Sequence, residues 1–575
     1  MPIHNADIAA IFEEMADLLE IENSNNVFRV RAYRNASRYL QEMGKDVRIM
    51  VQRGEDLTII PGIGEDLANK IQEIVETGHC SVLDKLHKQL PSTITELLKI
   101  PGLGPKRVKT LYQELDIHTM EQLQRAVRDH RIQSLAGFGE KTEMRIADAL
   151  AIYAGSTSRF KLATAAQYAE PLIAWLRTIS GVQQAIIAGS YRRAKETVGD
   201  IDILITAAQK SPVMTSFCSY DDITEVLSHG PTRSSVILKC KLQVDARVVE
   251  HESYGAALHY FTGSKAHNIA IRRLGQEQGL KINEYGVFKG QRRIAGETEE
   301  SVYQSVGLPF IPPELREDRG EIEAARSGHL PELIELGDLK GDLHAHSKAS
   351  DGHATLKEMA SAAQQCGFEY LAITEHSRQL TVAHGLDPTQ LAKQIDEIDR
   401  LNEQLTEITL LKGIEVDILE DGSLDLPDSI LARLDLVVGA VHSRFELSRA
   451  KQTERILKAM DHPHFTLLAH PSGRLIARRK PYDVDMLRII RKAKERGCYL
   501  ELNAHPERLD LLDIYCQAAK DEGVLISINS DAHSVLDFHN LRFGIGQARR
   551  GWLEKQNVLN TRSLQELKPL LKRTM

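Results

Sequence analysis

Two aspartates separated by one residue, Asp200 and Asp202, form the clearest chemical pattern in the chain. They lie in the apolar segment GDIDILI, and alternate residues of a strand point to one face, so their carboxylates should project together, about 6.6 Å apart. A third acid, Asp245, lies in the alternating segment KCKLQVDARVVE. Three converging carboxylates offer hard oxygen ligands for Mg²⁺ or Mn²⁺ and can hold two such ions. An acid-rich strand end at the surface is the alternative for a single D-x-D pair.

A turn rich in phosphate-binding groups precedes these acids. In AIIAGSYRR, Gly189 and Ser190 follow an apolar strand, and Arg192 and Arg193 come directly after. Guanidinium groups at such a turn can donate charge-assisted hydrogen bonds to the oxygens of a triphosphate. The turn and the acids together predict nucleotidyl transfer.

Histidines and acids recur at the ends of short apolar segments after residue 340. The segments are GDLHAHSKASDG, AITEHS, LKGIEVDIL, VVGAVHS, LLAHPSG and INSDAHS. Any one of these histidines is more often a hydrogen-bonded structural residue than a ligand. Six such strand ends in order predict a metal site, because successive strands of a barrel place their carboxyl ends around one centre.

The elements that must position these residues differ along the chain. Short apolar strands alternate with amphipathic helices in the last part, which predicts an α/β barrel or sheet. The two acid-bearing segments read as strands of a smaller α+β domain. The first part is helical, and we expect six domain ranges: 1–90, 91–155, 156–250, 251–317, a linker at 318–340, and 341–575. Mixed charge and helical spacing favour a short helix in that linker.

Three segments in the helical part repeat one pattern of an apolar lead-in, Gly-x-Gly and a helix. The glycines are Gly62, Gly64, Gly102, Gly104, Gly137 and Gly139. Glycine lets backbone N–H groups turn outward at a helix start, where the helix dipole also favours an anion. A plain helix-turn-helix with a glycine cap is the alternative for one copy. Three copies resemble helix-hairpin-helix motifs, which hold the DNA backbone without reading bases.

The pattern GSYRR(x6)GDIDILI is the nucleotidyltransferase signature, and HYFTGSKAHNIAIRRLGQEQGLKINEYGVF extends the resemblance to family X DNA polymerases. The resemblance covers roughly residues 1–315. By position it implies that Asp200, Asp202 and Asp245 hold metals, that Gly189, Ser190 and Arg193 bind the triphosphate, that Tyr260, Phe261 and Gly263 pack against the sugar, and that Asn268 and Arg272 reach the minor groove. It also implies that Asp245 accepts the primer 3′-hydroxyl proton. Gln243 departs from the family, where an arginine stands.

The same resemblance implies a lyase in the first domain. A lysine there forms a Schiff base and removes 5′-deoxyribose phosphate, and Lys70 in GIGEDLANK occupies the matching position. Asp66 replaces a second lysine of the animal enzyme. Because a Schiff-base lysine needs a depressed pKa, Lys70 is either this nucleophile or a helix-surface cation. Upstream, FRVRAYRNASRYL predicts a basic helix face carrying Arg34, which is either solvated or a groove for a DNA end.

The histidine-rich part resembles the PHP (polymerase and histidinol phosphatase) domain, a distorted (β/α)7 barrel. The matching residues are His344, His346, Asp351, His376, Glu415, His442, His470, Asp531 and His533. His353 competes with Asp351 for the third position. The resemblance implies up to three ions, and a mixed imidazole and carboxylate set suits Mn²⁺ or Zn²⁺. It implies 3′-to-5′ exonuclease and end-processing activity, with cleavage at abasic sites as a further possibility. Arg474, Arg478, Arg479 and Lys480 form either a grip on the DNA strand or a solvated basic loop.

Bulk properties agree with a multidomain protein of the cytoplasm. With 575 residues, 42% hydrophobic and 26% charged, the chain is too long for one core and too ordinary in composition for disorder. It carries no secretory signal or apolar run long enough for a membrane. Six scattered cysteines predict buried, reduced thiols. The net charge of −8 is unusual for a nucleic-acid-binding protein, but a whole-chain sum can hide local basic faces.

We therefore expect a monomeric, nucleoid-associated repair polymerase that binds gapped or nicked DNA and deoxynucleoside triphosphates, joined to a second phosphoesterase. Two other classes of function are also consistent with the sequence. The last domain could be a small-molecule phosphatase with the rest as a DNA anchor, which would not need an intact acid triad. The chain could also be a non-catalytic module that binds gaps and recruits repair proteins.

Overall fold

The computed structural model describes residues 3–22, 27–43, 45–100, 103–135, 137–155 and 159–574. It divides into two compact units, Met1–Arg159 and Phe160–Met575. None of the helices within the described ranges is both long and apolar enough to cross a lipid bilayer.

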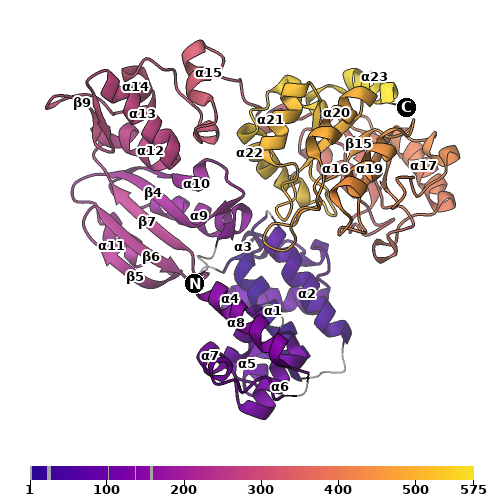
Figure 1. Cartoon of the computed structure of the whole chain (residues 1–575), viewed down its shortest axis with the longest axis horizontal. Coiled ribbons are helices and arrows are strands. Elements are labelled where there is room, and N and C mark those ends of the chain that lie inside the picture. Colours follow the sequence, from indigo (N-terminus) through magenta and orange to yellow (C-terminus); the bar gives the residue numbers. More distant parts are fainter. Residues whose placement is uncertain are drawn as a thin grey trace. The chain divides into compact units, whose positions relative to one another are not determined.

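The first unit is helical (Figure 1). Its elements are α1 (Asn5–Glu22), α2 (Val27–Glu42), α3 (Val47–Gln52), η1 (Leu57–Ile59), α4 (Glu65–Thr77), α5 (Ser81–His87), η2 (Ser92–Lys99), α6 (Pro105–Leu115), α7 (Met120–Arg128) and α8 (Glu140–Gly155). Helix α1 packs along α2, where Phe12 and Tyr33 bring their rings to 5.6 Å. Thr119 begins α7 with a capping box that includes Gln122, as the residue types at those positions favour.

The three Gly-x-Gly segments share one backbone hydrogen bond among their described residues. Each places a backbone hydrogen bond three residues back, from Ile63 to Ile60 at 3.0 Å, from Leu103 to Ile100 at 3.0 Å and from Phe138 to Leu135 at 3.0 Å. In the first and third copies, Gly62 and Gly137 have φ of +73° and +82°, which disfavours other residues. Gly102 lies outside the described residues.

In each copy the second glycine stands at the start of a helix. Gly64 and Gly104 are the N-cap residues of α4 and α6, and the carbonyl of Gly139 accepts from the N–H of Glu143 in α8. The first N–H groups of a helix have no partner within it and point away from it. The turns therefore offer the main-chain donors that a phosphate needs.

The second unit begins with a five-stranded sheet in the order β2-β4-β7-β6-β5. The elements of this region are β1 (Phe160–Lys161), α9 (Leu162–Leu176), β2 (Val182–Ile187), α10 (Gly189–Arg192), β3 (Thr197–Val198), β4 (Asp200–Ala207), α11 (Val213–Cys218), β5 (Ile223–His229), β6 (Arg233–Leu238) and β7 (Gln243–Val248). Strands β1 and β3 form a separate two-stranded sheet. Strands β4 and β7 are parallel, and the remaining neighbours are antiparallel. Helix α9 packs on β2.

A smaller lobe follows the sheet. It contains η3 (His251–Ser253), α12 (Tyr254–Thr262), α13 (Lys265–Glu277), the three-stranded sheet β8 (Lys281–Asn283), β9 (Gly286–Lys289) and β10 (Arg292–Ala295), then α14 (Glu299–Ser305), η4 (Pro313–Leu315) and α15 (Glu321–Ser327). Helix α12 contacts β4 and so connects this lobe to the acid-bearing strand. Helix α15 lies within 318–340, where the sequence favoured a short helix, and its Ile322 and Ala325 belong to the core of the lobe.

Seven parallel strands in sequential order, β11 to β17, form the last part. The strands are β11 (Gly341–Asp342), β12 (Tyr370–Ile373), β13 (Thr409–Asp417), β14 (Leu436–Ala440), β15 (Leu467–Leu468), β16 (Tyr499–Asn503) and β17 (Ile526–Asn529). A parallel bridge between Ala345 and Ala532 brings the two edges together, so the sheet is nearly closed. The predicted (β/α)7 barrel is confirmed.

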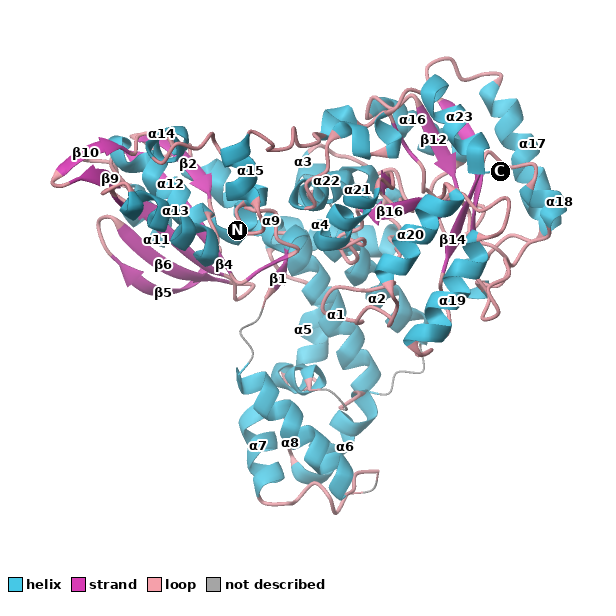
Figure 2. Cartoon of the chain, turned by 45° about the horizontal axis from the view of Figure 1, so that its top comes forward, coloured by secondary structure: helices cyan, strands magenta, loops and turns pink. Residues whose placement is uncertain are grey.

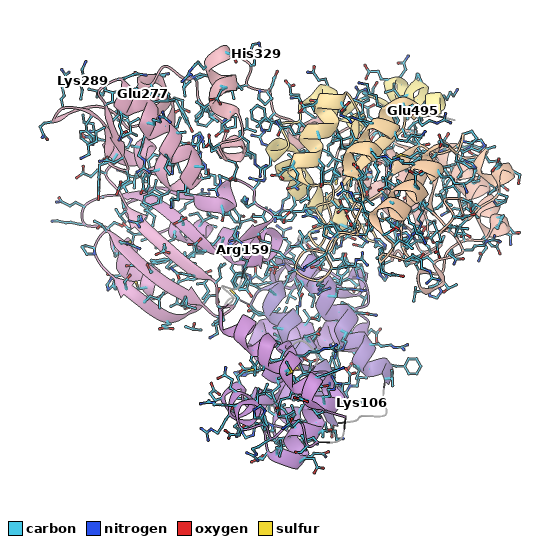
Figure 3. All side chains as sticks on the ribbon, in the orientation of Figure 1. Lys106, Arg159, Glu277, Lys289, His329 and Glu495 are labelled. Atoms are coloured by element: carbon cyan, nitrogen blue, oxygen red, sulfur yellow. The ribbon has the colours of Figure 1, made fainter. Side chains whose placement is uncertain are left out.

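Helices surround these strands (Figure 2). They are η5 (Leu336–Asp338), α16 (Leu356–Gln365), η6 (Thr381–Ala383), α17 (Pro388–Asn402), α18 (Asp428–Leu431), α19 (Arg449–Met460), α20 (Met486–Arg496), α21 (Asp513–Glu522), η7 (Asp537–Asn540), α22 (Leu541–Arg550), η8 (Lys555–Asn557), η9 (Leu559–Thr561) and α23 (Leu564–Thr574). Charged residues such as Glu495 of α20 face outward (Figure 3), while the strands are almost wholly buried, as parallel strands usually are.

The cysteines form no disulfide within the described residues. Cys80, Cys498 and Cys516 are buried, as expected. Cys366 is exposed because it caps the end of α16 at the surface, so the prediction of buried thiols is wrong there.

Candidate active sites

The parallel pairing of β4 and β7 brings the predicted aspartates together. Asp202 lies directly opposite Asp245 in the register, and Asp200 lies opposite Gln243. Alternation along β4 puts Asp200 and Asp202 on one face, with Ile201 and Ile203 buried on the other. Three carboxylates therefore meet at one edge of this sheet.

The proximity of the three acids changes the protonation of one of them. Burial and then the negative charges of Asp200 and Asp245 raise the pKa of Asp202 to about 7. A carboxyl group in this position holds a proton near neutral pH unless a cation replaces it. The cluster thus fits divalent ions with oxygen ligands.

Neighbouring side chains fix the orientation of Asp245. The Ser235 hydroxyl donates to Oδ1, and the Gln243 amide donates to Oδ2 at 2.8 Å. The guanidinium of Arg233 on β6 lies 3.8 Å from Oδ1. Gln243, which departs from the family pattern, therefore still contacts the carboxylate, and an arginine approaches it from the next strand.

The predicted phosphate turn lies against this cluster. Gly189 has φ of +63°, and a Cβ at this position would stand 2.5 Å from Oδ2 of Asp202. The N–H of Ala188 donates to the Asp202 carbonyl at 2.7 Å, which fixes the turn to β4. Only glycine allows so close an approach in this backbone conformation. Ser190 lies within α10, one residue further along.

The two arginines of the turn have different surroundings. Arg192 pairs with the buried Glu299 at 2.6 Å and donates to the Thr262 hydroxyl at 2.8 Å. Arg193 donates to Glu317 at 3.0 Å and to the Thr262 carbonyl at 2.7 Å. Both guanidinium groups are thus held by the smaller lobe, and Arg192 is part of its packing.

The segment predicted to meet the sugar ends α12. Tyr260 and Phe261 stack edge to face at 5.1 Å, and Arg247 of β7 lies 4.5 Å over the Phe261 ring. The Asn268 amide donates to the carbonyls of Tyr260 at 2.7 Å and Gly263 at 3.2 Å. Asn268 therefore braces this segment.

Close packing also explains the glycine of this segment. A Cβ on Gly263 would stand 2.4 Å from Oδ1 of Asn268. Arg272, one helical turn after Asn268, donates through Nε to the Asn268 carbonyl at 3.2 Å and is half-buried.

The predicted lyase residue lies in α4 of the first unit. Lys70 is buried, with 8% of its surface exposed, and its ammonium group pairs with Asp66 one helical turn earlier. Upstream, Arg34 of α2 contacts three carboxylates, Glu13 at 2.7 Å, Asp17 at 2.8 Å and Glu20 at 2.6 Å. Arg34 is therefore already neutralised within the helical unit, which weakens the prediction of a basic groove there.

The histidine-rich segments converge at one end of the barrel. Three groups of side chains place one ligand atom from each member within 4.8 Å of the others: His346, Asp351, His376 and His533; His344, His346 and Asp531; and His376, Glu415 and His442. His470 joins them through Nε2, 2.9 Å from Glu415. His353 is in none of the groups that the described residues form, so the geometry favours Asp351.

Buried atoms in these groups are suited to metal ions. His344 Nε2, both ring nitrogens of His346 and Glu415 Oε2 are buried without a hydrogen-bond partner in the part of the chain that the structure describes. Orphaned buried polar atoms are costly. The imidazole and carboxylate set fits Mn²⁺ or Zn²⁺.

The barrel interior shifts several pKa values in the metal-free cluster. Burial lowers the pKa of His346 to about 4, aided by His533 and His376. Burial also opposes the charged form of His376, but Glu415 and Asp351 raise its pKa to about 10. Bound cations would replace the protons that now balance these carboxylates.

Two ligand candidates have unusual backbones. His470 has φ of +28° and Asp531 has φ of +55°. Non-glycine residues seldom adopt these values, and such strain concentrates at functional sites. Asp351 and His533, at 30% and 29% side-chain exposure, form the accessible edge of the cluster.

Sequence reasoning missed the carboxylates behind the histidines. Glu501 of β16 lies 2.7 Å from Nδ1 of His344 and accepts from the His470 N–H at 2.7 Å. Asp417 lies 3.0 Å from Nδ1 of His442. Such partners orient metal-binding imidazoles. Asp417 stands two residues after Glu415 on β13, a spacing that could have revealed it.

A cation was also missed. Nε of Arg508, in the loop after β16, lies 3.6 Å from Oδ2 of Asp531, and its side chain is 20% exposed. By contrast, the predicted basic loop is largely structural. Arg474 pairs with Glu196 at 2.7 Å and Arg478 lies 3.5 Å from Glu507. Arg479 stacks on Phe445 at 4.1 Å, and Lys480 is exposed.

Five family models match successive parts of the chain. They are a helix-hairpin-helix domain at residues 3–80, a SAM-like helix-hairpin-helix tandem at 94–151, the DNA polymerase beta palm at 164–266, the DNA polymerase beta thumb at 257–317 and the PHP domain at 342–505. Each acid or histidine cluster described above lies mainly within one of these matches.

One relative matches almost the whole chain, and others match part of it. The chain is 39% identical to the DNA polymerase/3′-5′ exonuclease PolX of Bacillus subtilis (strain 168), over 99% of this chain and 100% of that protein. It is 26% identical to DNA polymerase lambda of Rattus norvegicus, over 55% of this chain and 56% of that protein. It is 29% identical to a probable phosphatase of Thermoanaerobacter sp. (strain X514), over 38% of this chain and 89% of that protein.

Proposed function

Because this chain belongs to the bacterial family X DNA polymerases that carry a PHP domain, we propose that it fills short gaps in DNA and removes nucleotides from 3′ ends. The proposed polymerase activity is supported by the register of β4 and β7, which sets Asp202 beside Asp245 and against the Gly189 turn. The exonuclease is supported by the three histidine and acid groups of the barrel.

The residues of the sheet have separate tasks in nucleotide addition. Asp200, Asp202 and Asp245 hold the ions, and Asp245 also accepts the proton of the primer 3′-hydroxyl. Ser235 and Gln243 keep the Asp245 carboxylate in place for this transfer. Gly189, Ser190 and Arg193 bind the triphosphate, and Tyr260, Phe261 and Gly263 pack against the sugar, with Asn268 and Arg272 toward the template duplex.

Both sites use divalent ions, which supply positive charge to stabilise phosphoryl oxygens when bound. We assign Mg²⁺ or Mn²⁺ to the carboxylate cluster and up to three Mn²⁺ or Zn²⁺ ions to the barrel. In the barrel, His344, His346, Asp351, His376, Glu415, His442, His470, Asp531 and His533 are the ligands. Arg508, at the edge of the cluster, is placed to contact a phosphate of the 3′ end.

The partners follow from the same elements. The helix-hairpin-helix turns of both matched segments bind the DNA backbone, so we propose gapped or nicked duplex as substrate and deoxynucleoside triphosphates as co-substrate. We expect a monomer that acts at the nucleoid in the cytoplasm, in base excision repair. The barrel would also process damaged 3′ ends and abasic sites.

Lyase activity at Lys70 is a separate proposal. Burial of the Lys70 side chain favours a nucleophilic lysine, whereas its pairing with Asp66 opposes one. Reduction with borohydride on DNA carrying a 5′-deoxyribose phosphate should trap a covalent adduct with the wild type and none with Lys70→Ala. An adduct of equal yield with the variant would assign the chemistry to another amine.

Primer extension tests the polymerase directly. Asp202→Ala should abolish extension on a gapped duplex while the protein still binds that duplex. Unchanged extension would contradict the assignment, and the matched exposed variant Asp221→Ala serves as the control.

A further inference from the structure

Arg193, the proposed triphosphate ligand, is held by other groups of the protein in this structure. Its Nε donates to Oε1 of Glu317 at 3.0 Å, and a terminal nitrogen donates to the Thr262 carbonyl at 2.7 Å. Only 13% of its side chain is exposed. A triphosphate must therefore compete with Glu317 for this guanidinium.

A second arginine, from the PHP domain, reaches the same carboxylate. Arg550, the last residue of α22, donates to Oε1 of Glu317 at 2.9 Å and to the Arg193 carbonyl at 3.0 Å. Its other terminal nitrogen donates to Asp513 at 2.8 Å, and Asp513 also accepts from Arg319 at 3.0 Å. Arg550 is 4% exposed, so the contact is enclosed.

One carboxylate oxygen thus serves two guanidinium groups. Burial opposes the charge of Glu317, but Arg193 and Arg550 hold its pKa below the ordinary value, so it is ionised at neutral pH. The attraction of Glu317 for Arg193 depends on how far Arg550 already balances its charge. Lys195, 4.0 Å from the same oxygen, adds a weaker contribution.

We propose that Glu317 and Arg550 are positioning residues that set the affinity for the incoming nucleotide. Glu317 holds Arg193 withdrawn, and Arg550 weakens this hold by sharing the carboxylate, so that a triphosphate can take Arg193 over. The PHP domain would thereby tune the polymerase through a single side chain. This inference rests on the proposed role of Arg193.

Steady-state gap filling at varied nucleotide concentration tests the proposal. Glu317→Gln should lower KM for the nucleotide about fivefold, and Arg550→Met should raise it about fivefold, each with kcat within about twofold, since coupled ion pairs differ by about 1 kcal/mol. The double variant should match Glu317→Gln, because Arg550 acts only through that charge. The proposal would be overturned if the two single substitutions had effects on KM of equal size that added in the double variant, or if Glu317→Gln raised KM.

Three further variants make the result interpretable. Arg542→Met removes another ion pair of α22, with Glu170 at 3.0 Å, and should leave KM unchanged. If Arg193→Met leaves KM unchanged, the proposed binding of the triphosphate by Arg193 is wrong, and not only the positioning of Arg193 by Glu317 and Arg550. If Arg193→Met raises KM but Glu317→Gln does not change it, the positioning proposal alone is wrong. Because Arg550 is buried, thermal unfolding of Arg550→Met checks that this variant is folded. Arg550→Lys keeps the charge and should keep KM near the wild-type value.

Discussion

At the scale of single residues, the charge on Asp202 sets how the polymerase site takes up metal. Burial together with Asp200 and Asp245 raises its pKa to about 7, so the metal-free site holds a proton below that pH. A divalent ion must displace this proton. Metal affinity therefore rises with pH until the carboxyl group is fully ionised.

We expect Mg²⁺ to bind the polymerase site about tenfold more tightly at pH 8 than at pH 6, the change for one proton with a pKa near 7. Titration calorimetry of the wild type and of Asp202→Asn would measure it. The variant cannot ionise at this position, so it should bind more weakly and with little dependence on pH. An equally steep dependence in the variant would assign the proton to another group.

The close approach of Gly189 to Asp202 gives a second prediction. Gly189→Ala places a methyl group 2.5 Å from Oδ2 and should reduce kcat for gap filling about 100-fold, because displacement of a reacting group by 1 Å has effects of that order. Gly290→Ala is the matched control, since Gly290 has φ of +60° with open space around it. Gly290→Ala therefore introduces the same kind of backbone strain as Gly189→Ala, but without a clash with a carboxylate. Equal losses in both variants would mean that strain, and not the carboxylate, is responsible.

Some residues could be predicted from sequence and others could not. Asp200 and Asp202 share a strand, and local alternation is enough to put them on one face. Glu501 lies far from His344 in sequence, and its role depends on which strands of the barrel face each other. Likewise, no local pattern shows that Arg193 is held by Glu317, because that contact needs the lobe to fold back on the turn.

At the scale of elements, β16 anchors the exonuclease site. Its Glu501 contacts His344 and the His470 N–H, and it also accepts from Asn503 at 3.1 Å and Asn529 at 2.9 Å. One carboxylate therefore holds two proposed ligands, His344 and His470, from the ends of two strands. The alternation of strands and helices predicted the barrel, but the strand register that brings Glu501 to His344 needed the structure.

Glu501→Gln should weaken Mn²⁺ binding by the barrel about 10- to 100-fold, which is typical when the partner of a metal-binding histidine is lost. Competition with a coloured chelator would measure it, and gap filling should be unaffected. Glu495→Gln on α20 is the control, because the exposed Glu495 pairs only with Lys492, at 3.1 Å, within the described region (Figure 3). Unchanged metal affinity in Glu501→Gln would show that Glu501 has only a packing role.

At the scale of the whole molecule, the net charge of −8 is compatible with DNA binding. Main-chain N–H groups at Gly-x-Gly turns need no basic side chains, and much of the negative charge lies in ion pairs or in metal-binding clusters. The order of domains was readable from the sequence because each domain carries its own local motif. The sharing of Glu317 between two domains could not be read from the sequence, because the contact between Glu317 and Arg550 joins residues more than 200 positions apart.

If the chain has two separate active sites, a substitution in one site should spare the activity of the other. A 3′-labelled primer on a gapped duplex is incubated with wild type, Asp202→Ala and His344→Ala, with and without nucleotides. We predict that Asp202→Ala loses extension and keeps trimming, while His344→Ala loses trimming and keeps extension. Loss of both activities in either variant, with its fold and DNA binding intact, would contradict two independent sites.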